Sequence, residues 1–248
     1  MIIGQGITIG GGINVIDNSV NQIEPVTSGL VLYYAPHNAS SYSGTGATIN
    51  SLASPNLTGT MSNITFTNPY FAYNGTSSTI SIADNAALEP GTGDFTVETW
   101  VNATTLLGSS RVILGKFNNG GASQHVSYAL RTAATGVTRF EVGNGTTALN
   151  SPTFTISTGT WYQIVGVWTN VAANSIELYV NGSTQGSSSH VFTSLLNSTN
   201  PLYLGSYNGG EYPQWWNGSI GIARIYNKAL SSAEVLQNWN ADKSIYGL

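Results

Sequence analysis

The chain has 248 residues, contains no cysteine, and draws only 7% of its residues from Asp, Glu, Lys and Arg, against about 25% in an average soluble protein. This length suits one all-β domain with a tail, and the missing cysteines exclude a disulfide framework and a thiolate metal site. The net charge of -4, with Lys and Arg scattered from Arg111 to Lys243, gives no basic surface for nucleic acid. No segment approaches the ~18 apolar residues of a membrane span, so we expect neither nucleic acid nor a membrane as a partner.

Residues 1–27 differ from the rest of the chain, because glycines interrupt a set of isoleucines: Ile2, Ile3, Ile7, Ile9 and Ile13. Glycine runs oppose a stable isolated helix or strand, whereas alternating isoleucines are costly to leave in water. We therefore interpret this segment as an N-terminal arm whose isoleucines are covered by a partner surface, for example by strand addition to an exposed sheet edge. A disordered start and a first strand of the domain itself are the alternatives.

From residue 28 onward, apolar side chains recur with a period close to two, which predicts short strands. In chain order these are Leu30–Tyr34, Ile64–Tyr73, Thr79–Ile82, Phe95–Val101, Val112–Phe117, Val126–Leu130, Val137–Val142, Trp161–Trp168, Ile176–Val180, Leu202–Leu204 and Ile220–Tyr226. Asn-Gly pairs at Asn74-Gly75, Asn144-Gly145 and Asn181-Gly182 supply the positive φ values that tight hairpins need. Because helix is nearly absent before Leu230, we expect an all-β fold, a two-sheet antiparallel jelly-roll sandwich over residues 28–248.

One short C-terminal helix is predicted after the last strand. Ser231 is a good N-cap, and Glu234 three positions later completes a capping box. Apolar side chains recur at helical spacing in this segment, at Ala233, Val235, Leu236 and Trp239. We expect them to lie on one face of an amphipathic helix that covers a sheet.

Several stretches, taken in order, resemble the laminin G-like branch of the concanavalin A-like lectin and glucanase superfamily. They are SGLVLYYAPHNASSYSGTG at Ser28–Gly46, FAYNGTSSTISI at Phe71–Ile82, GDFTVETWVNA at Gly93–Ala103, WYQIVGVWT at Trp161–Thr169, IELYVNG at Ile176–Gly182 and the ending at Gly218–Glu234. The resemblance covers residues 28–248 and implies the same concanavalin A-like fold. Trp100, Trp161 and Tyr179 are then expected as large core residues, and Gly182 in a turn conformation that side chains disfavour.

A narrower likeness is to versions of this domain in tailed-phage virion proteins, where SYSGTG near the start, an ending like QNWNADKSIYGL and a short Gly/Ile-rich N-terminal segment occur together. It implies a location in the virion and a non-enzymatic structural role, in which the chain decorates a capsid or tail and the arm anchors it. The implied partners are other virion proteins, such as the major capsid protein or a tail protein, and further copies of the chain. A lectin-like module that binds host surface glycans is the alternative.

Glycosidases of this superfamily need two carboxylates that face a sugar about 5 to 9 Å apart. The nearest pair in this sequence is Asp94 and Glu98, which are four positions apart on a predicted strand and therefore ~13 Å distant. We predict no catalytic residue and expect Glu98 to form hydrogen bonds at a sheet margin. His37, His125 and His190 lie in polar, loop-like sequence without the spacing of a zinc site, and we interpret them as surface histidines.

The resemblance also bears on calcium, because laminin G-like domains often hold one ion at the rim of the sandwich with oxygen ligands. The positions that are acidic in the family correspond here to Asn74, to the neighbourhood of Ser78, and to Gly221. Loss of anionic ligands weakens such a site steeply, although Asn74 and backbone carbonyls still offer oxygen atoms. We therefore predict no tightly bound calcium and no cofactor.

A loop rich in aromatic residues, SYNGGEYPQWW, precedes the last strand. Trp216 is expected in the core, where the family has an aromatic residue. Tyr207, Tyr212 and Trp215 are candidates for three roles that the sequence leaves open: a protein interface, ordinary loop packing, or stacking on a glycan.

Overall fold

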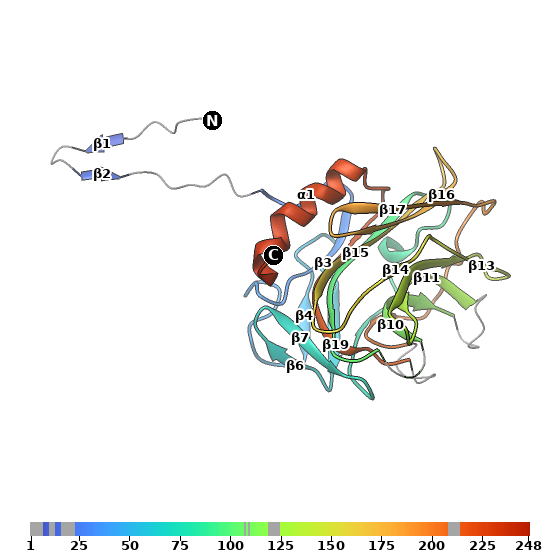
Figure 1. The fold of residues 1–248 in the computed structure, drawn as a ribbon, viewed down its shortest axis with the longest axis horizontal. Helices are drawn as coiled ribbons and strands as arrows, with labels where there is room; N and C mark the ends of the chain where they lie inside the picture. The colour runs from blue at the N-terminus through green and yellow to red at the C-terminus, as the bar shows by residue number, and fades with distance from the viewer. Residues whose placement is uncertain are drawn as a thin grey trace.

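The computed structural model describes residues 23–106, 108, 110–118, 125–207 and 214–248, together with the backbone of two strands at residues 7–9 and 13–15. Two antiparallel sheets pack face to face, and one C-terminal α-helix lies on the outer side of one of them (Figure 1). The expected all-β sandwich is confirmed. No helix among the described residues has the length and apolar character to cross a membrane.

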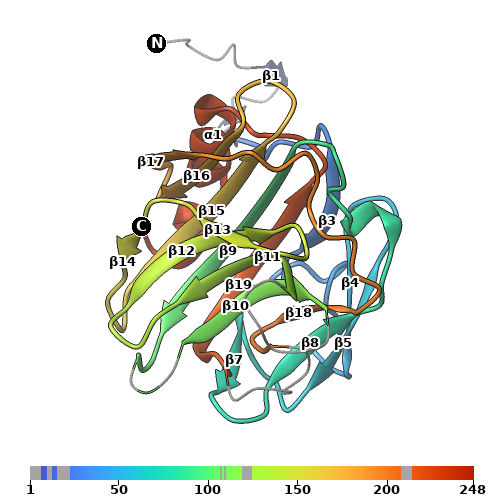
Figure 2. The ribbon, with the colours of Figure 1, turned by 90° about the vertical axis from the view of Figure 1, so that its right-hand side faces the viewer.

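The sheet with nine described strands is called the front sheet here, and the sheet with eight is called the back sheet. The front sheet runs through β13 (Ala148–Asn150), β12 (Val137–Gly143), β11 (Val126–Thr132), β10 (Arg111–Phe117), β18 (Leu202–Leu204), β8 (Thr79–Ile82), β5 (Thr58–Ser62) and β4 (Thr48–Asn50), with β14 (Phe154–Thr155) beside β12. The back sheet runs through β17 (Ser183–Ser189), β16 (Ser175–Val180), β15 (Trp161–Thr169), β9 (Phe95–Ala103), β19 (Asn217–Tyr226), β7 (Tyr70–Asn74) and β6 (Thr65–Thr67), with β3 (Leu30–Tyr34) beside β19. Figure 2 shows the front sheet facing the viewer.

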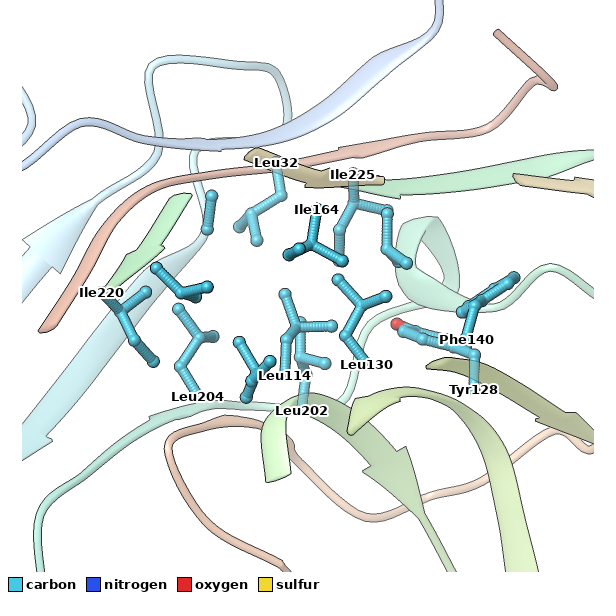
Figure 3. Close-up of a cluster of buried hydrophobic side chains, with 14 of the residues drawn as sticks. Leu32, Leu114, Tyr128, Leu130, Phe140, Ile164, Leu202, Leu204, Ile220 and Ile225 are labelled. Atoms are coloured by element: carbon cyan, nitrogen blue, oxygen red, sulfur yellow. The ribbon is translucent and has the colours of Figure 1, made fainter. Parts of the chain in front are cut away.

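The main core lies between the two sheets, where alternate residues of each strand point inward. Figure 3 shows leucines of the front sheet facing aliphatic side chains of the back sheet, and all of them are 2% exposed or less: Leu114, Leu130, Leu202 and Leu204 against Leu32, Ile164, Ile220 and Ile225. Burial of an aliphatic side chain of this size contributes about 1.5–3 kcal/mol. This layer therefore holds the two sheets together.

A second apolar layer lies on the outer face of the back sheet, beneath α1 (Ser232–Asp242) and the 3-10 helix η4 (Lys243–Tyr246). The predicted capping box is confirmed, because the Ser231 hydroxyl accepts from the Glu234 amide and the Glu234 carboxylate accepts from the Ser231 amide. Trp100 of β9 stacks on Trp239 of α1 and on Tyr246 of η4, with ring centroids 5.0 and 4.4 Å apart.

This layer corrects two sequence expectations. Trp100 is fully buried, as predicted, but it lies under the helix rather than between the sheets. Leu236, expected on the inward face of the helix, is 47% exposed, whereas Val235 is fully buried. The helix buries a narrower stripe than the apolar pattern indicates, and that stripe also contains the polar residues Asn238 and Asp242.

The strand pattern differs from the sequence prediction where polar or turn residues intervene. The predicted strand Ile64–Tyr73 is two strands, β6 and β7, which pair with each other across the Asn68-Pro69 turn. Asn74-Gly75 does not make a hairpin, because β7 belongs to the back sheet and the next strand, β8, to the front sheet. Asn181-Gly182 does form a tight hairpin between β16 and β17, with φ of 52° and 75°.

The edge strand β17 carries a bulge. Its pairing with β16 shifts register between Glu177 and Tyr179, and Gly186 has φ of 107°, in the region that favours glycine. The strand is largely exposed and contains neither a charged residue nor a proline. The bulge is therefore the main irregularity of an otherwise regular edge.

Part of the predicted N-terminal arm also forms strands. β1 (Ile7–Ile9) pairs antiparallel with β2 (Ile13–Val15), with Ile7 opposite Val15 and Ile9 opposite Ile13. Among the described residues these two strands form a sheet of their own and pair with no strand of the sandwich. The alternative of a first strand of the domain is therefore wrong for β1 and β2, whereas Ile2 and Ile3 lie outside the described residues.

Candidate functional site

Glu98 lies at the centre of a fully buried polar cluster under α1. Arg224 of β19 donates from Nη1 to Glu98 Oε1 at 3.1 Å, and from Nη1 and Nη2 to the two carboxylate oxygens of Asp242 at 2.5 and 2.9 Å. Gln163 of β15 donates to Glu98 Oε1 at 2.8 Å, and Asn238 of α1 donates to Oε2 at 2.6 Å. The prediction that Glu98 lies at a sheet margin is wrong, because β9 is flanked by β15 and β19.

This cluster has a structural role, because it joins α1 to strands β9 and β19 of the back sheet. Burial raises the pKa of Glu98 above its ordinary value, Arg224 opposes the rise, and Asp242 adds to it. Every hydrogen-bonding neighbour of Glu98 is a donor, which matches an ionised, acceptor-only carboxylate. Because Glu98 is 0% exposed, no substrate can reach it without displacing the helix.

A second ion-pair cluster is centred on Lys116, whose side chain is fully buried, whereas those of Glu89 and Asp84 are 10% and 36% exposed. The Lys116 ammonium is 2.7 Å from Asp84 Oδ1 and 2.8 Å from Glu89 Oε1, and it donates to the Asn200 carbonyl at 2.6 Å. Burial by itself would raise the pKa of Asp84, but the hydrogen bond and charge of Lys116 hold it below its ordinary value. Burial raises the pKa of Glu89, and Lys116 opposes this rise. The ammonium thus forms two hydrogen bonds, to Asp84 and the Asn200 carbonyl, and an ion pair with Glu89.

The predicted pair Asp94 and Glu98 does not form a catalytic couple. Asp94 precedes β9 and accepts from the backbone amides of Asn170 and Val171 at 2.8 and 3.0 Å, so it caps a loop. Three further carboxylates of the described chain also have partners: Glu141 with Arg131, Glu177 with Ser175 and Tyr179, and Glu234 with Lys228. These carboxylates therefore serve ion pairs and hydrogen bonds within the fold.

The positions that correspond to the family's calcium ligands have other partners. Asn74 Oδ1 accepts from the amides of Thr76, Ser77 and Ser78 at 2.9, 2.9 and 3.2 Å, which closes the turn after β7. The space beside Gly221 is filled by the Tyr246 side chain, whose hydroxyl accepts from the Ile222 amide. The described residues contain no group of three or more His, Cys, Asp or Glu that could hold a metal ion.

The described residues of the aromatic loop lie largely in the interior. Tyr207 is 2% exposed and its ring centroid lies 4.2 Å from that of Phe117, so of the three roles left open by the sequence it has ordinary packing. Trp216 is fully buried, as expected, whereas Trp215 is half-buried and its carbonyl accepts from Arg111 at 2.7 Å. Tyr212 lies outside the described residues. Trp215 is the member of this set that the structure leaves partly open.

One of the three histidines is also buried. His190 is 6% exposed, stacks on Trp168 with centroids 3.7 Å apart, and forms a hydrogen bond between Nε2 and the Thr169 carbonyl. The interpretation of His190 as a surface histidine is therefore wrong, whereas His37 is exposed and His125 is half-exposed. The signal that sequence reasoning missed was the neighbouring Phe192, which is buried in the main core.

The outward face of the front sheet carries a cross-strand row of hydroxyl groups that sequence reasoning did not identify. The register places Tyr203 of β18 opposite Ser81 of β8, Ser81 opposite Thr60 of β5, and Thr60 opposite Thr48 of β4. Their neighbours Leu202, Ile80 and Ile49 point into the core, so these four face outward. Thr48 and Thr60 are exposed, and Ser81 and Tyr203 are half-buried. We call this set the hydroxyl row; it spans about 14 Å at ~4.8 Å per strand.

Comparison with known proteins agrees with this architecture. Residues 74–236 match the family described as the concanavalin A-like lectin/glucanases superfamily. The chain belongs to this superfamily. No curated protein matches the sequence of this chain.

Two groups of solved structures are similar to this lectin-like fold. Trypanosoma rangeli sialidase, in complex with a difluorinated sugar acid, superposes with a TM-score of 0.66 and 16% identity over 88% of this chain and 33% of the sialidase chain. The receptor-binding domain of botulinum neurotoxin type G gives a TM-score of 0.64 and 14% identity over 86% of this chain and 51% of the other. The binding domain of botulinum neurotoxin DC, in complex with rat synaptotagmin II, gives 0.64 and 13% over 86% and 51%. The chain thus spans a third to a half of these proteins, and the likeness concerns the fold.

Proposed function

We propose that the chain is a non-enzymatic binding module of a tailed-phage virion, which decorates the capsid or tail and is attached through its N-terminal arm. The observation that carries this proposal is the β1–β2 hairpin, which forms a sheet of its own. A two-stranded hairpin is at best marginally stable in water. Alternation along the two strands puts four aliphatic residues at positions of one face: Ile7, Ile9, Ile13 and Val15. A partner surface that covers this face would supply the missing stability.

Three further observations support the proposal. The ion pairs of Glu98 and Lys116 and the loop-capping role of Asp94 give these carboxylates partners within the fold, which favours binding over hydrolysis. The charged fraction of 7% suits close packing among other virion proteins and further copies of the chain, because association then depends little on salt. The sequence likeness at both chain ends to tailed-phage virion proteins favours the location.

Matched substitutions on the two faces of the hairpin test the attachment. Ile9→Asp and Ile13→Asp place a charge on the aliphatic face, whereas Thr8→Asp and Asn14→Asp place the same charge on the opposite face. Particles assembled with each variant are purified and the chain is quantified by mass spectrometry. We expect the first pair to lower incorporation at least tenfold and the second pair to leave it near the wild-type amount. Normal incorporation of Ile9→Asp and Ile13→Asp, or of a chain without residues 1–22, would refute the anchoring role.

Glycan recognition is the second candidate, and the hydroxyl row favours it. Tyr203 offers an aromatic ring, and Ser81, Thr60 and Thr48 offer hydroxyl groups; the row itself contains no Asp, Glu, Lys or Arg. Aromatic faces stack on sugar rings, and hydroxyl groups both donate and accept hydrogen bonds. Such a surface suits a neutral sugar rather than a charged one.

A glycan array tests this second candidate. Tyr203→Ala changes the hydroxyl row, Trp215→Ala changes the half-open residue of the aromatic loop, and Tyr70→Ala is a matched control on the back sheet. We expect a neutral glycan to bind the wild type and the Tyr70→Ala control, and to lose at least tenfold in affinity with Tyr203→Ala. A silent array, or equal binding by all variants, would remove the hydroxyl row from consideration.

A further inference from the structure

The segment between the arm and the first strand of the sandwich, residues 23–29, is called the arm root here. Most of it is open to solvent: Ile23 is 51% exposed, and Glu24, Thr27 and Ser28 are exposed. Val26 is the exception, with 7% exposure. Its side chain packs in a small apolar cluster between α1 and the back sheet, with Val165, Val167, Tyr179, Tyr226, Leu230 and Val235. One residue of an exposed segment is therefore inserted under the C-terminal helix.

Side chains from the far end of the sequence satisfy both backbone groups of Val26. The Val26 amide donates to Asn238 Oδ1 at 2.8 Å, and the Tyr226 hydroxyl donates to the Val26 carbonyl at 3.1 Å. Gln237 Nε2 adds a bond to the Glu24 carbonyl at 2.8 Å. A buried backbone group without a partner costs about 1–3 kcal/mol, so these bonds decide whether Val26 can remain buried.

Asn238 couples the arm root to the buried ion cluster. While its Oδ1 accepts from Val26, its Nδ2 donates to Glu98 Oε2 at 2.6 Å and to the Tyr226 hydroxyl at 2.9 Å. Asn238 is 0% exposed. A single amide therefore connects the arm root, the helix and the back sheet, and it cannot leave one partner without disturbing the others.

We propose that α1 is a clamp that fixes the arm root to the sandwich, so that tension on the arm is carried by the C-terminal helix and the cluster beneath it. The inference rests on the proposed anchoring role of the arm. If the clamp opened, the chain would be free up to the start of β3 and the tether would lengthen by about 23 Å at ~3.3 Å per residue. A longer tether lowers the effective concentration of the sandwich at its binding site. The clamp thus sets where the module sits relative to its point of attachment.

Hydrogen exchange on the intact, isolated chain tests the clamp without any virion. In the wild type, we expect the Val26 amide to exchange as slowly as core amides of β10 and β11, and at least a hundredfold more slowly than the exposed Glu24 amide. Tyr226→Phe removes one hydroxyl, and Asn238→Ala removes the shared amide. Asn240→Ala is the matched control on the same helix, since its side-chain oxygen accepts from Lys243 of the helix end rather than from the arm root.

We expect Tyr226→Phe and Asn238→Ala to speed Val26 exchange at least tenfold, with core amides unchanged in Tyr226→Phe and in the control. Should Asn238→Ala fail to fold, Tyr226→Phe and the wild-type comparison still decide the question. Rapid exchange of the wild-type Val26 amide, or no effect of Tyr226→Phe, would overturn the clamp. The anchoring role is measured separately by incorporation into particles, so the two proposals can fail independently.

Discussion

The contact between Gly221 and Tyr246 can be tested by adding one methyl group. In Gly221→Ala, the new Cβ would lie 2.7 Å from the Tyr246 ring carbons Cε1 and Cζ, and still closer to its hydroxyl. The ring cannot simply swing aside, because it stacks on Trp100 with centroids 4.4 Å apart and its hydroxyl accepts from the Ile222 amide at 2.8 Å. The substitution must therefore displace a packed aromatic residue of η4.

Two costs contribute to the loss of stability expected for Gly221→Ala. Overpacking of a well-packed region costs about 1–3 kcal/mol, and loss of the hydrogen bond leaves a buried amide unpaired at about 1–3 kcal/mol. We expect Gly221→Ala to lower the free energy of unfolding by about 2–6 kcal/mol. For a domain of this size, at about 2–4 °C per kcal/mol, that corresponds to a fall in Tm of about 4–24 °C.

A double-mutant cycle with Tyr246→Phe isolates the contact. Urea unfolding of the wild type, both single variants and the double variant gives the coupling, which we expect to exceed about 1 kcal/mol, because removal of the hydroxyl relieves the closest approach. Gly93→Ala serves as a control, since its added Cβ would meet only the Pro90 carbonyl, at 3.3 Å. A change below about 0.5 kcal/mol for Gly221→Ala, or strict additivity in the cycle, would refute the reasoning.

Three further predictions follow from the ion pairs and the turn after β7. Burial raises the pKa of Glu98 from its ordinary 4.5, so the contribution of Glu98 to stability is present below that pH and is lost as the pH rises through the folded-state pKa. Glu98→Gln should therefore flatten the fall in stability above about pH 4.5, measured by urea unfolding at a series of pH values. An unchanged pH profile would contradict this. Lys116→Met leaves Asp84 and Glu89 without their cation and should cost about 1–3 kcal/mol by chemical denaturation, less than for a fully buried pair because the Asp84 side chain is 36% exposed; a loss below about 0.5 kcal/mol would contradict this. Asn74→Asp should not create calcium affinity, because the side-chain oxygen already closes a turn; micromolar binding by isothermal titration would show the opposite.

Local sequence signals located the elements whose structure depends on neighbours in the chain. The capping box of Ser231 and Glu234 needs only residues within one helical turn, and it is present as predicted. The Asn181-Gly182 turn needs only two positive φ values, and it forms a hairpin. Period-two alternation placed most strands that bury one face.

Strands without apolar alternation could not be found in this way. β17 consists of polar residues and glycine, because it is an exposed edge held by pairing with β16. The same limit explains β4 and β5, where only Ile49 and Met61 bring large apolar side chains to the core. Pairing partners, which supply the order in these strands, come from elsewhere in the sequence.

Whether a candidate site residue is exposed depends on the segment that covers its side chain. The alternation of apolar and polar residues along a strand does not identify that segment. Glu98 was assigned correctly to a strand, but the helix that buries it begins more than a hundred residues later. The sequence around Tyr207 indicates a loop, but the ring of Phe117, from a strand far away in the sequence, makes Tyr207 an interior residue. Tyr203 was assigned to a predicted strand without a role, because the hydroxyl row becomes visible only when the register of four strands is known.

The bulge in β17 has a consequence for encounters between molecules of this chain. A regular, uncharged strand at the border of a sheet can pair with a like strand of another molecule. Gly186, with φ of 107°, interrupts the ladder of hydrogen-bonding groups on that border. The interruption opposes edge-to-edge association, in a strand that contains neither lysine nor proline.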